Sequence, residues 1–500
     1  MSAPKTVRLT IDGRAVEADA GTNVLRAAEK AGIAIPHFCF HPGLDVEGSC
    51  RMCLVEIEGL PKLELACSTV VREGLAVRTT TERVRRARRD VLEFLLAEHP
   101  LDCPICDKAG ECRLQDYYDL HGRHPGRMLE PRESRAKKVP IGRGLILDRE
   151  RCVLCTRCVR FLRQVTGTGE LGVFERALRS EIGIFDGTPV DNRYAGNLVD
   201  ICPVGAITSE DFRFRTRAWF LTRRPSICPH CSRGCAVSVE SRAGYPLAEG
   251  ERRVYRIAAR ENPAVNGFWM CDLGREGRRD IEAGRLSVPL RQGRPDPGLS
   301  WTEAAGEAAA AIGRIPAGER GEKTAVVLNG RLTCEELARA RASFVDGLGC
   351  RNIFFADSRP GRADGPLLTA ERTPNLRGAV AAGFSPRLPD LGELAAARVL
   401  LVFGSRLAEH HGGPELARAL SGGPRTFLFA AHAGPLDGLA EMAVPVAVPA
   451  EKSGTYINID GLAQAFDRSL EPAPGGPAEG AVLEALARGL GLDRGGGDGR

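Results

Sequence analysis

The chain has 500 residues, of which 43% are hydrophobic and 27% are charged, and its formal net charge is +5. These proportions are ordinary for a globular protein, so they exclude a largely disordered chain, and the length predicts several domains. No run of the roughly 18 apolar residues that a bilayer requires occurs, so we expect no membrane-spanning helix and no secretory or transit leader.

Cysteine is the most informative residue type in the chain. Fifteen of the 17 cysteines fall into four groups before residue 272, and one histidine falls at ligand spacing in the second group. The first set is Cys39, Cys50, Cys53 and Cys67; the second set is His99, Cys103, Cys106 and Cys112; the third set is Cys152, Cys155, Cys158 and Cys202; the fourth set is Cys228, Cys231, Cys235 and Cys271. In a chain that is not secreted, such cysteines stay reduced, which favours metal ligation. Four metal centres along one chain predict an electron-transfer protein.

Residues 1–80 predict a β-grasp, ferredoxin-like domain. A hairpin over residues 7–18 turns at Asp12-Gly13, and Thr22 is placed to cap the helix that follows. Further strand-like segments lie at residues 53–57, 63–66 and 75–80. The first set reads C-x10-C-x2-C-x13-C, which lengthens the first interval of the plant-type [2Fe–2S] pattern. A [2Fe–2S] cluster is favoured, and a structural zinc site is the alternative.

Residues 81–125 predict a helical domain with the second set near its middle. The helix runs to Glu98 and is stopped by Pro100, with arginines expected opposite its apolar stripe. The stripe consists of Val84, Ala87, Val91 and Leu95. The second set reads H-x3-C-x2-C-x5-C, which on its own leaves zinc and a [4Fe–4S] cluster equally open. Because histidine donates less charge than thiolate, a cluster ligated in this way has an altered potential.

Residues 140–225 predict a ferredoxin-like domain that holds one [4Fe–4S] cluster. The third set begins with C-x2-C-x2-C, a run that binds three irons of a cubane and that zinc rarely uses. In the bacterial ferredoxin run, the cysteine that precedes proline ligates a different cluster. Here the closing ligand is the distant Cys202-Pro203, after 43 intervening residues.

The fourth set defines a further segment, residues 226–285. Its spacing is C-x2-C-x3-C-x35-C. Four cysteines already complete a cluster, so His230 is interpreted as a neighbour of the site and not as a ligand.

Residues 286–490 predict an α/β domain with a largely parallel sheet. Apolar strands alternate with helical stretches, and Thr333 and Glu336 have capping-box spacing at the start of one helix. The strands are expected at residues 324–330, 352–355, 399–403, 426–429 and 443–448. Cys334 and Cys350 are interpreted as packing residues. The glycine-rich residues 491–500 predict a disordered tail.

The charge does not indicate nucleic-acid binding. Fifteen thiolates, set against one [2Fe–2S] and three [4Fe–4S] cores of roughly +2 each, bring the net charge to about −2. Neither a P-loop nor a strand–GxGxxG–helix unit occurs, so we expect no flavin or NAD on this chain.

Several stretches resemble one family closely. They are RCVLCTRCVRF at residues 151–161, NLVDICPVGAI at 197–207, DFRFRTRAW at 211–219 and RENPAVNGFWMCD at 260–272. Together with the order of the four sets, they resemble the large iron–sulfur subunit (the G subunit) of bacterial NADH:quinone oxidoreductase, respiratory complex I. The resemblance is specific over about residues 1–285. Later residues, including EKSGTYINIDG at 451–461, resemble part of a molybdopterin-oxidoreductase domain.

The resemblance implies cofactors and a role for each set. The first three sets would hold a [2Fe–2S] cluster, a histidine-ligated [4Fe–4S] cluster and an all-cysteine [4Fe–4S] cluster, and the fourth set a third [4Fe–4S] cluster off the main route. The α/β domain resembles a truncated molybdopterin-oxidoreductase domain, and Asp272-Leu273 follows Cys271 where active pterin enzymes place a lysine. We therefore expect no molybdopterin.

The resemblance also implies partners. These are a flavin-bearing, NADH-oxidising subunit with its small [2Fe–2S] partner, a downstream subunit with two [4Fe–4S] clusters, and the quinone-module subunits. The implied location is the cytoplasmic face of the bacterial inner membrane, with the chain peripheral and held by the complex. Two alternatives remain, the electron-input subunit of an NAD-linked hydrogenase or formate dehydrogenase, and a multi-zinc scaffold.

Overall fold

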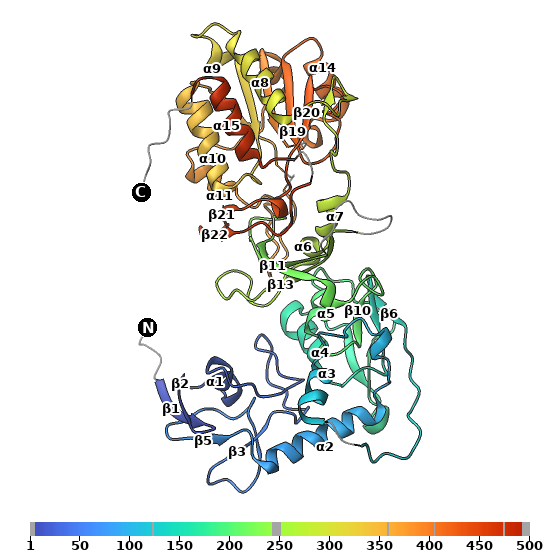
Figure 1. Ribbon diagram of the computed structural model, residues 1–500. Coiled ribbons are helices and arrows are strands. Elements are labelled where there is room, and N and C mark those ends of the chain that lie inside the picture. The colour runs from blue at the N-terminus through green and yellow to red at the C-terminus, as the bar shows by residue number, and fades with distance from the viewer. Residues whose placement is uncertain are drawn as a thin grey trace. The chain divides into compact units, whose positions relative to one another are not determined.

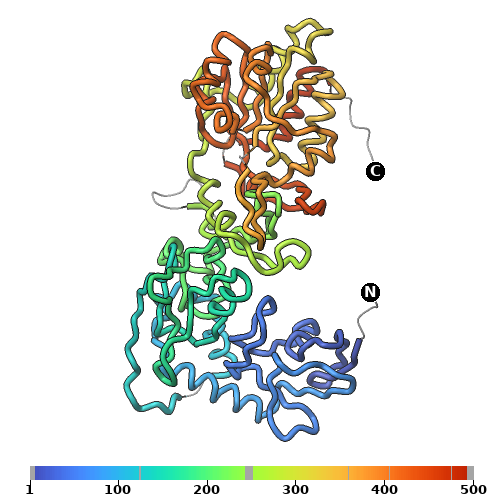
Figure 2. Tube along the Cα trace, turned by 180° about the vertical axis from the view of Figure 1, so that it is seen from behind, coloured from blue at the N-terminus to red at the C-terminus, as the bar shows by residue number. Residues whose placement is uncertain are grey.

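The computed structural model describes residues 6–122, 125–242, 252–357, 360–404, 406–473 and 476–492. The chain divides into two compact units, Met1–Leu221 and Thr222–Arg500, and can be followed from the blue to the red end in Figures 1 and 2. Among the described residues, no helix is long and apolar enough to cross a membrane. Of the predicted C-terminal tail, residues 493–500 lie outside the described part of the chain.

The first unit begins with the expected β-grasp arrangement. Its five-stranded sheet has the order β2-β1-β5-β3-β4. The elements are β1 (Thr6–Ile11), β2 (Arg14–Asp19), α1 (Val24–Lys30), β3 (Leu54–Ile57), β4 (Glu64–Leu65) and β5 (Ala76–Arg78). The hairpin turns at Asp12 and Gly13, which both have positive φ, as a tight two-residue turn requires. The predicted cap was one residue early: Asn23, and not Thr22, accepts the N–H of Arg26 at 2.9 Å.

A long helix then leads to the second set. Helix α2 (Glu82–Glu98) ends at Glu98, as predicted; Thr81 is its N-terminal cap and His99 its C-terminal cap. Three short helical segments follow, η1 (Cys103–Ile105), α3 (Arg113–Tyr117) and η2 (Tyr118–Gly122). One feature of the prediction for α2 was wrong: Arg88 does not face away from the apolar side. It is buried together with Val84 and Leu92.

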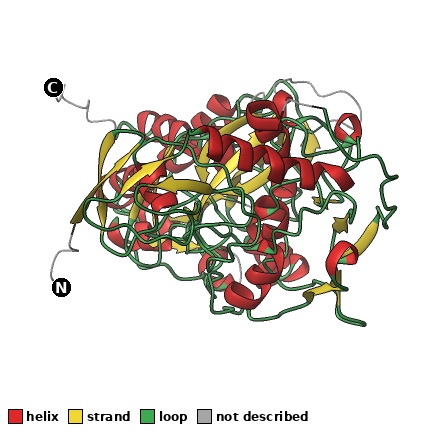
Figure 3. Ribbon diagram, turned by 90° about the horizontal axis from the view of Figure 1, so that it is seen from below, coloured by secondary structure: helices red, strands yellow, loops and turns green. Residues whose placement is uncertain are grey.

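The rest of the first unit is built from short elements and long loops, which Figure 3 shows in green. Strands β10, β7 and β6 form one antiparallel sheet, and β8 pairs with β9. The elements are β6 (Val139–Gly142), β7 (Leu145–Leu147), α4 (Arg157–Phe161), η3 (Leu162–Thr166), β8 (Leu171–Phe174), η4 (Ala177–Arg179), β9 (Glu181–Ile184), α5 (Asn197–Ile201), β10 (Ile207–Ser209) and η5 (Ala218–Phe220).

The second unit opens with a three-stranded antiparallel sheet that carries the fourth set. Its strands are β11 (Thr222–Ile227), β12 (Ala236–Ser241) and β13 (Val254–Ala259), followed by α6 (Asp272–Glu276) and α7 (Arg278–Glu282). The main sheet comes next, with the order β15-β14-β20-β19-β18-β16-β17. Its strands β17, β16, β18, β19 and β20 are mutually parallel, as predicted for an α/β domain.

The strands and helices of the α/β domain occur in the predicted order along the chain. The strands of the main sheet are β14 (Leu290–Arg291), β15 (Arg294–Pro295), β16 (Thr324–Leu328), β17 (Asn352–Phe355), β18 (Val399–Phe403), β19 (Arg425–Ala430) and β20 (Met442–Pro445). The remaining elements are α8 (Trp301–Gly313), α9 (Arg320–Lys323), α10 (Cys334–Ala340), η6 (Arg341–Gly347), α11 (Leu376–Ala381), α12 (Leu391–Ala395), α13 (Leu407–His411), α14 (Gly413–Leu420), η7 (Pro449–Glu451), β21 (Gly454–Ile457), β22 (Ala463–Phe466) and α15 (Glu479–Gly489). The predicted capping box at Thr333 and Glu336 is present at the start of α10.

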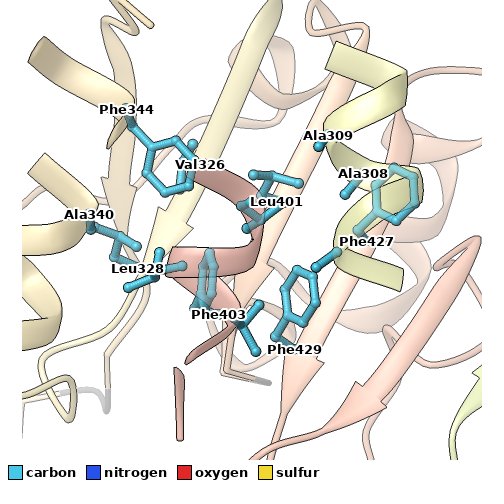
Figure 4. Packing of buried hydrophobic residues seen from close by; sticks show 14 of the residues in the cluster. Ala308, Ala309, Val326, Leu328, Ala340, Phe344, Leu401, Phe403, Phe427 and Phe429 are labelled. Carbon is cyan, nitrogen blue, oxygen red and sulfur yellow. The ribbon is translucent and has the colours of Figure 1, made fainter. Parts of the chain in front are cut away.

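The parallel sheet has an apolar core on each face. Successive residues of β16 alternate between the two cores, so that Val326 and Leu328 belong to one and Ala325 and Val327 to the other. On the first face, aromatic side chains of β19 pack against small residues of α8 (Figure 4). Because both faces of the sheet are covered, these strands are apolar throughout and lack the alternation of a half-exposed strand.

A buried ion triad supports the α/β domain and gives a first prediction. The ammonium of Lys452 lies 2.8 Å from Glu336 and 2.9 Å from Glu479, and all three side chains are almost inaccessible. The change Lys452→Met leaves two buried carboxylates without a counter-ion, so we expect it to lower the free energy of unfolding by about 3–5 kcal/mol. Thermal denaturation measures this effect. Lys323→Met, which removes a surface ion pair, serves as the control and is expected to cost less than about 1 kcal/mol.

Candidate metal centres

All 17 cysteines are free thiols in the structure, and most members of the four sets are buried. Among the described residues, no group of three or more histidine, cysteine, aspartate or glutamate side chains is arranged to hold a single metal ion. A polynuclear cluster does not require such convergence, because its four protein ligands are distributed over two or four irons. The second and third sets each line one cavity.

Two members of the first set, Cys53 and Cys67, belong to the apolar core of the β-grasp domain. The thiols of Cys39 and Cys50 form one hydrogen-bonded pair, and those of Cys53 and Cys67 form another. Electrostatic interactions link Cys67 to both members of the first pair. The hydrogen bond from Cys50, aided by backbone N–H groups, lowers the pKa of Cys39 to about 5. The same hydrogen bond, together with burial, raises the pKa of Cys50, so one member of the pair is favoured as the thiolate that binds metal.

Backbone N–H groups also approach the sulfurs of the first set. The N–H of Phe38 donates to the sulfur of Cys50 at 3.4 Å, and N–H groups of Ser49 and Cys50 interact with the sulfur of Cys39. Such hydrogen bonds stabilise negative charge on sulfur and tune the potential of a bound cluster.

The second set lines one cavity of 470 Å³. His99 enters from the end of α2, and the three cysteines enter from η1 and the loop that precedes α3. Burial lowers the pKa of His99 to about 4, so its imidazole is neutral near pH 7, as ligation requires. The cavity therefore presents one neutral nitrogen and three thiols, a donor set that fits a [4Fe–4S] cluster or zinc.

The third set lines a much smaller and largely apolar cavity of 20 Å³. All four cysteines contribute to it, so the distant Cys202 does join the C-x2-C-x2-C run. Burial and mutual repulsion raise the pKa of Cys155 to about 11. Leu154 and Thr156, which separate the three local cysteines, both have positive φ, which is uncommon outside glycine. This strained loop directs three sulfurs into one pocket, where a bound cationic core would compensate the charge of their thiolates.

The fourth set lies in the second unit, at the end of β11, before β12 and at the start of α6. Its cysteines are buried, and electrostatic interactions link Cys228 to the other three. Gly274 packs against two sulfurs, because a Cβ at this position would lie 2.8 Å from that of Cys228 and 3.9 Å from that of Cys271. His230 is a buried neighbour, with Nδ1 3.8 Å from a carboxylate oxygen of Asp280.

The second and third sets of the first unit share one segment of chain. Pro203 accepts the N–H of Arg113 at 3.1 Å, directly after Cys112. Two residues later, Gly205 contacts the sulfur of Cys106 so closely that a Cβ would lie 2.1 Å from it. The peptide that closes the third set therefore also forms part of the wall of the second.

This contact gives a second prediction. Gly205→Ala should displace the sulfur of Cys106 and reduce cluster occupancy of the second set, while iron remains in the first set. Iron and acid-labile sulfide contents, together with the electron paramagnetic resonance (EPR) spectrum of the reduced protein, measure this change. Gly306→Ala, where a Cβ meets open space in α8, should leave both unchanged. An unaltered second-set signal in Gly205→Ala would contradict the contact.

The two remaining cysteines have contacts in the α/β domain. The thiol of Cys350 donates to the carbonyl of Thr324 at 3.1 Å, and Cys334 lies 3.6 Å from the side-chain oxygen of Asn375. The residues that sequence reasoning missed are arginines. Arg88, Arg157 and Arg160 are buried, although nothing in the spacing of arginines distinguishes them from the exposed ones.

Three protein families match segments of this chain, and these segments contain the first, second and third ligand sets in order. Residues 4–82 match a 2Fe-2S iron-sulfur cluster binding domain, and residues 88–127 match the NADH-ubiquinone oxidoreductase-G iron-sulfur binding region. Residues 142–208 match the ferredoxin-like domain of NADH-quinone oxidoreductase subunit 3. The chain is therefore an iron–sulfur protein with 2Fe-2S and 4Fe-4S binding domains of ferredoxin type.

Related proteins show which family of iron–sulfur proteins the chain resembles. The G subunit of NADH-quinone oxidoreductase from Streptomyces coelicolor is 43% identical over 336 residues, which is 66% of this chain and 38% of the relative. The mitochondrial 78 kDa subunit of NADH-ubiquinone oxidoreductase from Candida albicans is 38% identical over 349 residues, 69% of this chain and 47% of the relative. A crystal structure of an NAD+-reducing [NiFe]-hydrogenase in the H2-reduced state is 33% identical, covering 42% of this chain and 90% of that one, with a TM-score of 0.39.

Over the matched region, the chain belongs to the G-subunit family of NADH-quinone oxidoreductases, as the resemblance predicted. It spans less than half the length of these two curated relatives.

Proposed function

We propose that this chain is the electron-carrying iron–sulfur subunit of an NADH:quinone oxidoreductase. The observation that carries the proposal is the second set: one histidine and three cysteines line a single cavity inside the region that matches the oxidoreductase-G iron-sulfur family. Bound clusters would supply one-electron carriers at these positions. The residues of the chain hold them apart from solvent, provide thiolate and imidazole ligands, and set their potentials by charge and hydrogen bonding.

The proposed ligand assignment follows the four sets. The first set binds one [2Fe–2S] cluster and the other three bind [4Fe–4S] clusters, the second with His99 as a ligand. We assign the ligand-bearing domains to residues 1–80, 81–125, 140–225 and 226–285. Residues 286–490 are proposed as a domain of molybdopterin-oxidoreductase type without pterin, so metal analysis of the purified protein should find no stoichiometric molybdenum.

The proposed partners are a flavin-bearing NADH-oxidising subunit with its small [2Fe–2S] companion, a downstream subunit with two [4Fe–4S] clusters, and the quinone module. Through them the chain would lie at the cytoplasmic face of the bacterial inner membrane. Purification of the tagged chain from membranes tests this directly. NADH should reduce its clusters only when the flavin-bearing partner co-purifies, and a quinone analogue should reoxidise them. Reduction by hydrogen through a co-purifying nickel protein would instead indicate a hydrogenase.

A further inference from the structure

Helix α4 carries two buried arginines on either side of Cys158. Arg157 and Arg160 are three residues apart, so they project from the same side of the helix. Only 3% and 7% of their surfaces are exposed, although arginine is rarely buried without a partner. Their contacts lie in the first unit and lead to the ligand loops of two different sets.

Arg160 connects the third set to the first. One guanidinium nitrogen, Nη2, donates to the carbonyl of Cys155 at 3.2 Å and also to the carbonyl of Cys39. The other terminal nitrogen, Nη1, donates to the carbonyl of Asp45, farther along the loop between Cys39 and Cys50. Nη2 of Arg160 therefore bridges the backbone carbonyls of Cys39 and Cys155, two ligand residues that belong to different sets.

Arg157 forms a second connection of the same kind. It donates to the carbonyl of Ile201 at 3.1 Å, directly before Cys202, and to the carbonyl of Phe40, directly after Cys39. Its Nε is buried without a hydrogen-bond partner. Among the described residues, no carboxylate forms an ion pair with Arg157, whereas Nε of Arg160 lies 3.8 Å from the carboxylate of Glu47. Its electrostatic interactions with Cys155, Cys202 and Cys39 place the charge between the two sets.

A buried cation of this kind requires a negative charge nearby. A guanidinium group stays protonated in proteins, so Arg157 and Arg160 are both charged at pH 7. Four thiolates around a core of roughly +2 leave a bound cluster at about −2, and reduction adds one more negative charge. A fixed cation stabilises the reduced form more than the oxidised form, and it does so most strongly where water is excluded.

We propose that Arg157 and Arg160 are positioning residues that couple the ligand loops of the first and third sets. They fix the two ligand loops against each other, and their charges raise the reduction potentials of the clusters in both sets. The inference rests on the proposed function. When one electron passes between the two sets, one cluster is oxidised and the other is reduced, no bond forms or breaks, and both guanidinium groups keep their protons.

Redox titrations of the full chain, followed by EPR, test the proposal. Arg157→Met and Arg160→Met should each make reduction of both sets about tenfold less favourable, equivalent to about 59 mV for a one-electron couple. Arg157→Lys and Arg160→Lys keep the charge and should recover most of this change. Arg163→Met, at an exposed position just beyond α4, is the matched control and should leave the potentials unchanged. The second set should shift less, because the hydrogen bonds described for the two arginines lead to the loops of the first and third sets.

Unchanged potentials in a methionine variant with full iron and sulfide content would overturn the proposal. If the methionine variants do not assemble, the unaltered protein still provides a test. With both sets reduced, the two EPR signals should show mutual spin–spin broadening or faster relaxation, and independent signals would overturn the proposal. Failure of the proposed function is recognised separately, either because the protein lacks iron and sulfide or because hydrogen, through a co-purifying nickel protein, reduces its clusters.

Discussion

The change Cys202→Ala is expected to remove one [4Fe–4S] cluster, about four iron atoms per chain, while leaving the other sets loaded. Cys202 lies at the end of α5, far from the rest of its set in sequence, yet it lines the same apolar cavity. Three thiolates cannot complete a cubane there, and the other residues that line the 20 Å³ cavity carry no thiol, imidazole or carboxylate that could substitute. In the proposed complex, electron transfer from NADH to quinone should fall by more than the roughly 10–100-fold typical of losing an outer-shell partner.

Iron and sulfide analysis of the purified variant measures the loss, and the EPR spectrum identifies which signal disappears. Cys334→Ala provides the matched control, because this thiol contacts Asn375 in the α/β domain and belongs to none of the four sets. It should retain full iron content and activity. Full cluster content in Cys202→Ala would show that this cysteine is not a ligand.

The second large effect is expected at His99. His99→Cys should retain a [4Fe–4S] cluster but lower its potential by about 100 mV or more, because thiolate donates more charge than imidazole, and two histidines raise Rieske centres by several hundred mV. His99→Ala should lose the cluster. Because the buried imidazole of His99 is neutral, replacing it with a cysteine thiolate adds one negative charge to the cavity.

A redox titration of the second-set signal measures the shift, with Met128→Leu as the control because this uncharged side chain lines the same cavity without being a candidate ligand. If both His99 variants keep the unaltered potential, His99 is not a ligand. If none of the proteins shows a second-set signal and all contain zinc, the cavity is a structural zinc site.

Local signals in the sequence predicted much of this fold. The Asp12-Gly13 turn, the capping box at Thr333 and the apolar strands of the parallel sheet are each encoded by neighbouring residues, and the structure confirms all three. The cap of α1 was misplaced by one residue because Thr22 and Asn23 are both competent caps, and only the backbone conformation distinguishes them.

Long-range contacts could not be predicted in the same way. Cysteine spacing suggested that Cys202 closes the third set, and the shared cavity supports that grouping. The contact between Gly205 and Cys106, and the bonds from Arg157 and Arg160 to the loop of Cys39, join residues about 100 apart and have no local signature. Arg88 looked like one more solvated arginine of α2, because helical periodicity does not report what packs against each face.

Metal and sulfide analysis of the anaerobically purified chain, combined with EPR of its reduced form, tests the central claim most directly. One [2Fe–2S] and three [4Fe–4S] clusters require about 14 iron atoms and 14 sulfides per chain. The protein should be brown, with one signal of [2Fe–2S] type and the rest of [4Fe–4S] type. A colourless protein that contains zinc and no acid-labile sulfide would contradict the account.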